Sequence, residues 1–121
     1  MTNLLETFNI DIVQLKKEQV VIEVDVTDDM KQPFGVIHGG MNAVLIETAI
    51  SLGGTENIED GHASGVEINV NHIRPVSTGR LITTATPVHI GKNTQIWTAE
   101  IKNNDGKTTA VGRMTLMNVK N

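Results

Sequence analysis

Apolar and polar residues alternate along several segments of this chain, a pattern typical of half-buried β-strands. Residues 19–27 carry valine or isoleucine at positions 20, 22, 24 and 26, and residues 65–73 repeat the pattern at 66, 68 and 70. Further strands are predicted over 80–90, 94–102 and 108–119, with a short early strand over 11–19. Turn sequences at 91–93 and 103–107 separate the later strands, so an antiparallel sheet is expected.

One segment predicts a helix, from Gly40 to about Leu52, with apolar residues around almost its whole circumference. Such a helix is expected to be buried on all sides. In the preceding loop, Pro33 disfavours helical angles at Gln32, and the pair Gly39 and Gly40 permits close backbone approach. The predicted fold class is therefore α+β, with a curved antiparallel sheet wrapped around a single buried helix.

A carboxylate, Glu47, lies in the middle of the apolar helix. An ionised carboxylate among apolar neighbours needs a hydrogen-bond partner, a proton or a cavity. Rotation of Glu47 toward solvent is the simple structural explanation, whereas a catalytic base or nucleophile is the functional one. Ser51 lies one turn later on the same face, within reach of Glu47.

The glycine pair favours the functional explanation. A glycine turn at a helix start leaves N–H groups unpaired and reinforced by the helix dipole, which suits them to polarise a carbonyl. Gly39 and Glu47 are eight residues apart, which is about 12 Å along a helix and too far for both to contact one acyl carbon. If both are catalytic, a homodimer with composite sites is expected.

Composition limits the remaining possibilities. The 121 residues fit one domain, 1–121, and the chain contains no cysteine, which argues against disulfides and zinc–thiolate sites and favours a cytoplasmic location. The N-terminal residues do not resemble a signal peptide, and no apolar run is long enough to span a bilayer. The four histidines do not share metal-ligand spacing, so no metal site is expected.

The net charge of −4 conceals a basic island at 68–99, which contains no Asp or Glu. Its cationic and titratable residues are His72, Arg74, Arg80, His89 and Lys92. On composition alone, chance and a site for a compact anion such as a phosphorylated cofactor explain the island equally well. A nucleic-acid groove would need more charge and more aromatic residues than Phe8, Phe34 and Trp97 provide.

Together, the segments QPFGVIHGG, LIETAIS, EINVNHIRP and HIGKNTQIW resemble the hotdog-fold acyl-CoA thioesterases. The likeness is to the branch that contains phenylacetate-pathway thioesterases, the 4-hydroxybenzoyl-CoA thioesterase with a glutamate nucleophile, and 1,4-dihydroxy-2-naphthoyl-CoA hydrolase. It covers the chain from about Val20 onward. The resemblance implies a hotdog fold, hydrolysis of an acyl-CoA to free acid and CoA, no metal or redox cofactor, and a tetramer built from two dimers.

The resemblance also implies a role for each matching residue. Glu47 would be the nucleophile or general base, and the Gly39 N–H would polarise the thioester carbonyl. Gln32 and His38 would position the substrate or the leaving thiolate, and Ser51 would help to hold water. The CoA portion would bind at Gly65, at His72, Ile73, Arg74 and Pro75, and at His89, Ile90, Gly91, Lys92, Asn93 and Thr94.

Several alternatives remain open. His38 beside the glycine pair is equally compatible with a capping role, and His62 is expected to be solvated. The candidate acyl-pocket residues are Met41, Asn42, Ala43, Ile50 and Leu52, which do not distinguish an aromatic from an aliphatic acyl group. A hotdog dehydratase acting on 3-hydroxyacyl thioesters and a non-catalytic acyl-CoA sensor are the rival functions.

Overall fold

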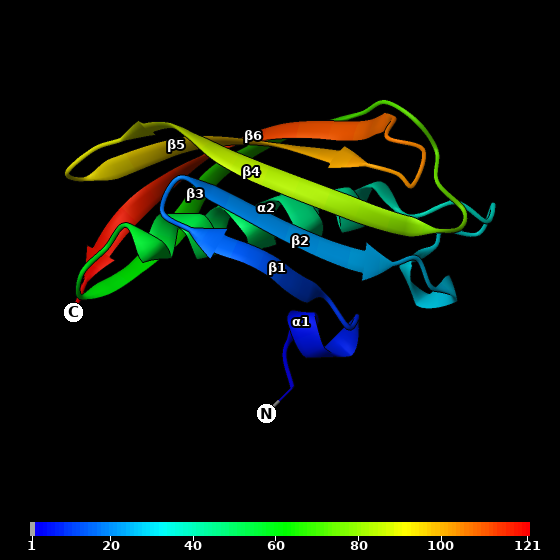
Figure 1. Cartoon of the computed structure of the whole chain (residues 1–121), viewed down its shortest axis with the longest axis horizontal. Coiled ribbons are helices and arrows are strands. Elements are labelled where there is room, and N and C mark those ends of the chain that lie inside the picture. Colours follow the sequence, from blue (N-terminus) through cyan, green and yellow to red (C-terminus); the bar gives the residue numbers. More distant parts are fainter. Residues whose placement is uncertain (1) are drawn as a thin grey trace.

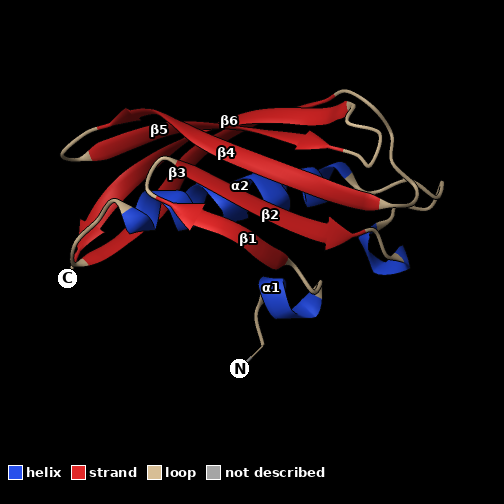
Figure 2. Cartoon of the chain, viewed as in Figure 1, coloured by secondary structure: helices blue, strands red, loops and turns tan. Residues whose placement is uncertain are grey.

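A curved sheet wraps around one long helix, and the computed structural model describes this arrangement for residues 2–121 (Figure 1). In chain order the elements are α1 (Leu4–Thr7), β1 (Asp11–Lys16), β2 (Gln19–Asp25), the 3-10 turn η1 (Asp28–Met30), α2 (Gly39–Glu56), β3 (Gly61–His72), β4 (Arg80–Ile90), β5 (Thr94–Lys102) and β6 (Thr108–Lys120). Figure 2 shows α2 lying along the sheet, with α1 beyond the β1 edge. The predicted α+β hotdog architecture is confirmed.

All neighbouring strands are antiparallel, in the order β1-β2-β4-β5-β6-β3. Strands β4 and β5 begin and end at the predicted residues, since their alternation faces the core on one side. Strand β3 departs from the predicted burial of its apolar face, because Val66 is 59% and Ile68 is 37% exposed. The alternation in β3 therefore marks apolar residues on an edge strand that the rest of this chain leaves uncovered.

The core lies between α2 and the inner face of the sheet, and its largest side chain is Trp97, which is fully buried. The Trp97 Nε1–H donates to Gln95 Oε1 at 2.8 Å, and Gln95 Nε2 donates to the Gly54 carbonyl at 3.0 Å. Trp97 is thus a packing residue, as its alternation in β5 predicts. The helix continues through Gly53 and Gly54 because the absence of side chains there lets α2 approach β5 and β6 closely.

Arg80 is part of the predicted basic island, yet it forms ion pairs within the sheet. Its guanidinium contacts Glu23 at 2.8 Å, Asp11 at 2.6 Å and Asp25 at 3.0 Å, which joins β4 to β1 and β2. The hydrogen bonds that the guanidinium donates to Glu23, Asp11 and Asp25 raise the pKa of Arg80 further above its ordinary value. The Arg80 side chain therefore holds β4 to β1 and β2, and an anion site would have to use the other basic residues of the island.

Candidate functional site

The start of α2 lines a cleft of about 330 Å³. Gly39 and Asn42 contribute from the helix, and His72, Ile73, Arg74 and Pro75 contribute from the end of β3 and the following loop. The loop before the helix is anchored by Ile37, whose N–H donates to the Val76 carbonyl at 2.8 Å. The structure thus gathers Gly39 and the predicted segment 72–75 in one place.

His38 is the N-cap of α2, where its Nδ1 accepts from the Gly40 N–H at 3.0 Å. The Met41 N–H donates to the His38 carbonyl at 2.9 Å. Among residues 2–121, the Gly39 N–H is then left without an acceptor, and the helix dipole adds positive potential at that point. An N–H without an acceptor is what the carbonyl-polarising role predicted for Gly39 requires, and the capping role considered for His38 is observed.

Gln32 lies at the base of the loop that leads to α2. Its side-chain oxygen accepts from the Phe34 N–H, and its backbone N–H donates to the Val36 carbonyl at 2.9 Å. The side-chain oxygen is therefore occupied within the loop, which leaves the amide N–H₂ group as the donor that a substrate could meet.

Glu47 lies in a different pocket, of about 530 Å³, which Ser51 also lines. Glu47 is exposed in the single chain, so the rotation toward solvent considered for this carboxylate is observed and the expectation of a helix buried on all sides is wrong. The face of α2 that carries it is not covered by the sheet, so the helix is not buried on all sides. An added Cβ on Gly65 would lie 3.1 Å from Glu47 Oε2, so glycine at this position of β3 leaves room for the carboxylate.

The walls of the Glu47 pocket differ from the prediction. Met41 and Ile50 are buried in the core, Asn42 lines the cleft at the helix start, and Leu52 alone of the five candidate acyl-pocket residues lines the pocket. The remaining apolar lining comes from Val44 of α2 and from three N-terminal leucines, namely Leu4, Leu5 and Leu15. Sequence reasoning missed Leu4 and Leu5 because helix α1 is too short for its periodicity to be recognised, and it missed Leu15 because the pattern does not show that this residue of β1 lies beside α2.

The predicted segment 89–94 comprises the end of β4, the turn 91–93 and the first residue of β5. Asn118 of β6 holds this turn, since its side chain donates to the carbonyls of Gly91 at 3.0 Å and Lys92 at 2.9 Å. His89 and Lys92 are exposed there. Asn118 thus holds the backbone of the turn in place, and the Lys92 ammonium group is exposed to solvent.

The candidate residues fall into two groups near opposite ends of the sheet. Along β6, His72 is paired with Ala110, whereas Thr94 is paired with Met117. Seven residues of strand separate these positions, or about 24 Å. We call the group containing Gly39 and His72–Pro75 the N–H half-site, and the group containing Glu47, Ser51, Gly65 and the segment 89–94 the carboxylate half-site. One chain does not bring the two half-sites together.

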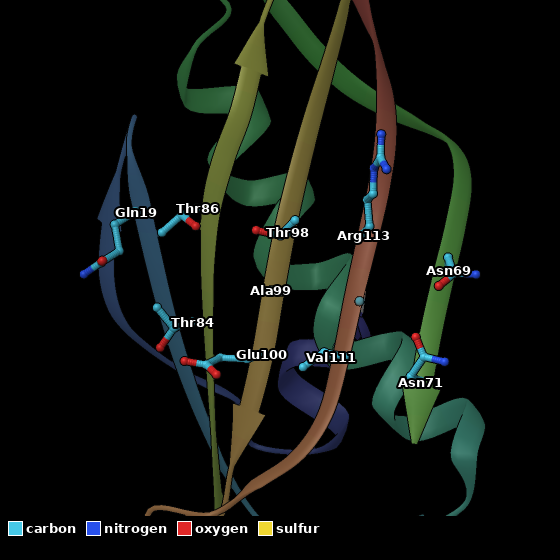
Figure 3. Close-up of a pocket in the computed structure, with 11 residues that line it drawn as sticks. Gln19, Asn69, Asn71, Thr84, Thr86, Thr98, Ala99, Glu100, Val111 and Arg113 are labelled. Carbon is cyan, nitrogen blue, oxygen red and sulfur yellow. The ribbon is translucent and has the colours of Figure 1, made fainter. Parts of the chain in front are cut away.

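The outer face of the sheet, opposite α2, is also hollowed, with a volume of about 640 Å³. Figure 3 shows the side chains on this face, which include Thr84, Thr98 and Arg113. The predicted site residues are absent from the lining of this hollow, so it is separate from both half-sites.

Comparison with known proteins identifies the family of this chain. Residues 34–110, which include Gly39, Glu47 and His72, match the thioesterase superfamily. This chain belongs to the thioesterase superfamily. The 1,4-dihydroxy-2-naphthoyl-CoA hydrolase of Listeria monocytogenes is 40% identical to this thioesterase over 93% of each chain.

Solved structures give the same result. A variant of a thioesterase enzyme from Staphylococcus aureus is 41% identical to this thioesterase with a TM-score of 0.93, over 97% of this chain and 98% of that one. The Escherichia coli PaaI protein from the phenylacetic acid degradation operon is 26% identical with a TM-score of 0.87, over 95% of this chain and 83% of that one. The resemblance to this branch and the expectation of a thioester hydrolase are confirmed. Within residues 2–121, none of the helices is long and apolar enough to cross a membrane.

Proposed function

We propose that this thioesterase hydrolyses acyl-CoA thioesters in a homodimer whose composite sites pair the N–H half-site of one subunit with the carboxylate half-site of the other. The observation that carries the proposal is the separation of the half-sites along β3, with an apolar and uncovered strand edge between them. Family membership supports the reaction class. The chemistry of the half-sites supports a donor to the thioester carbonyl from one subunit and a nucleophile or base from the other.

Pairing of two β3 edges offers a way to unite the half-sites. On β3, Gly65 and His72 are seven residues apart, and Ile68 lies near the middle of this span. A two-fold axis near Ile68 would place the partner subunit's His72 beside Gly65, and therefore close to Glu47. The pairing would also satisfy the free backbone groups of the edge and cover Val66 and Ile68. We further propose that two such dimers form a tetramer.

The chemistry follows from the assembled site. The Gly39 N–H would donate to the thioester oxygen and stabilise the negative charge that develops on it. Glu47 would either attack the acyl carbon to form an anhydride, which water then hydrolyses, or accept a proton from an attacking water, with Ser51 holding that water. The C–S bond breaks and the thiolate leaves as CoA. This chemistry needs water as its one co-reactant, and we propose no metal or redox cofactor.

The chemistry of the pocket walls supports an assignment of each part of the substrate. The acyl group would occupy the Glu47 pocket, whose leucine-rich lining suits an aromatic or aliphatic group. The CoA phosphates would lie near the exposed Lys92 and Arg74, each of which presents a cation at a half-site. Gln32 would position the thioester through its amide N–H₂ group.

The experiment is release of free thiol from benzoyl-, phenylacetyl-, hydroxynaphthoyl- and short-to-long aliphatic CoA esters by the wild type and Glu47→Ala. We expect the wild type to turn over at least one ester and Glu47→Ala to lower kcat on the order of 10²–10⁴-fold. Glu59→Ala removes the same charge from an exposed position just after α2 and should behave as the wild type. Equal activity of Glu47→Ala and wild type would refute the mechanism. Saturable binding without turnover would instead favour the sensor.

A further inference from the structure

Asn42 is a polar residue in the interior of the N–H half-site. It lies one turn after the helix start, and 3% of its surface is exposed. Its Nδ2 lies 3.0 Å from His72 Nδ1, whereas its Oδ1 has no hydrogen-bond partner among residues 2–121. An amide buried in this way costs free energy that an apolar residue of similar size would not. Packing alone therefore does not explain why a polar amide is buried at this position.

The edge of the His72 ring opposite Asn42 faces Gly39 at the start of α2. A Cβ added to Gly39 would lie 2.9 Å from His72 Nε2 and 3.0 Å from Cε1. The imidazole is thus seated against the first residue of α2, where a side chain would displace it. Asn42 and Gly39 are three residues apart on the same helix face, so one helix turn contacts both edges of the ring.

The side-chain placement of Asn42 indicates which nitrogen of His72 carries the proton. With Asn42 Nδ2 facing the ring as the donor, His72 Nδ1 is the acceptor and the proton of the neutral ring is on Nε2. Nε2–H then lies beside the Gly39 backbone, whose own N–H has no acceptor among residues 2–121. Besides His72, Arg74 is the titratable side chain among the described residues that line this cleft, and its guanidinium remains cationic.

We propose that Asn42 is a positioning residue that holds His72 in the Nε2–H tautomer, so that His72 and the Gly39 N–H donate together to the thioester group. A carbonyl oxygen has two lone pairs, and a second donor strengthens as charge develops on that oxygen in the transition state. This role rests on the proposed hydrolysis, and it assigns a function to an amide that the catalytic pattern at Glu47 and Gly39 does not include.

The first test is the tautomer of His72 in the full-length wild type, measured by ¹⁵N NMR of histidine-labelled protein, with the signal assigned by its loss in His72→Gln. We expect the neutral ring to carry its proton on Nε2, with Nδ1 unprotonated. A proton on Nδ1 would overturn the proposal without any variant at position 42 having to fold.

The second test is the kinetics of Asn42→Leu and Asn42→Asp on the best CoA ester, with folding checked by circular dichroism. In Asn42→Leu the ring loses its orienting donor, so kcat should fall on the order of tenfold while KM changes little. In Asn42→Asp the carboxylate accepts from Nδ1–H. The protonated ring keeps its Nε2–H, whereas the neutral ring keeps its one proton on Nδ1 and loses the Nε2 donor. The kcat profile of Asn42→Asp should therefore gain an alkaline limb.

The outcomes separate this role from the proposed function. No hydrolysis of any CoA ester by the wild type would refute the proposed function, and this role with it. Hydrolysis by the wild type combined with unchanged kcat in Asn42→Leu would overturn the positioning role alone. The predicted tautomer, the lower kcat of Asn42→Leu and the alkaline limb of Asn42→Asp would together establish it.

Discussion

Replacement of Gly53 by alanine tests whether close approach of α2 to the sheet holds this fold together. A Cβ at this position would lie 2.5 Å from Trp97 Cη2, 2.7 Å from Trp97 Cζ3 and 2.9 Å from Val20 Cγ2. Trp97 is fully buried and its indole N–H is held by Gln95, so the ring has little freedom to move away. The new methyl group must therefore shift the helix or strain the core.

The expected magnitude is a balance of two effects. Overpacking of a tight core costs up to about 3 kcal/mol, whereas Gly→Ala in a helix interior gains about 1 kcal/mol. Gly53→Ala should therefore destabilise the fold by about 2 kcal/mol, which corresponds to a fall in Tm of roughly 8 °C for a chain of this size. Thermal unfolding at one fixed protein concentration measures it, since any oligomer makes Tm depend on concentration.

A double-mutant cycle with Trp97→Phe identifies the cause. Phenylalanine lacks the outer ring atoms that meet the new Cβ, so Gly53→Ala should cost less in the Trp97→Phe background than in the wild type. A Gly53→Ala variant as stable as the wild type, or an equal cost in both backgrounds, would refute the claim that contact with Trp97 requires glycine here.

Two further predictions concern the basic island. Arg80→Met should lower Tm, because it leaves Asp11, Glu23 and Asp25 without their shared cation, and the loss should shrink in high salt; an unchanged Tm would show that this network does not stabilise the sheet. Lys92→Ala should raise KM for CoA esters severalfold with kcat nearly unchanged, because a phosphate contact is lost equally in the ground and transition states. A normal KM would place the CoA phosphates elsewhere.

Much of the fold is predictable because its signals are local. Strands β4 and β5 follow from strict alternation between turn sequences, and the start of α2 follows from the glycine pair. The end of α2 is not predictable in this way. Gly53 and Gly54 are typical helix terminators, yet the helix continues to Glu56 because Trp97 and Leu116 pack against it where the side chains are missing.

The site is only partly predictable because the residues that surround it come from segments far apart in the sequence. The types of residue in the motif indicate Glu47 and Gly39, but the periodicity of α2 does not reveal which of its faces the sheet leaves open. The prediction of a helix buried on all sides failed for that reason. The contact between Asn42 and His72 joins residues 30 positions apart, and it depends on how β3 packs against the start of the helix.

Subunit complementation tests the central claim of a composite site most directly. Glu47→Ala removes the carboxylate, and Gly39→Val fills the space in front of His72, so each homo-oligomer should be inactive. A dimer that pairs the two variants across β3 has one intact composite site out of two, with Glu47 from one subunit and Gly39 from the other. Hetero-oligomers purified through two different tags contain such dimers, so we expect activity far above both parents and at most about half of the wild-type kcat for hydrolysis of the best CoA ester. A hetero-oligomer as inactive as its two parents would contradict the composite site.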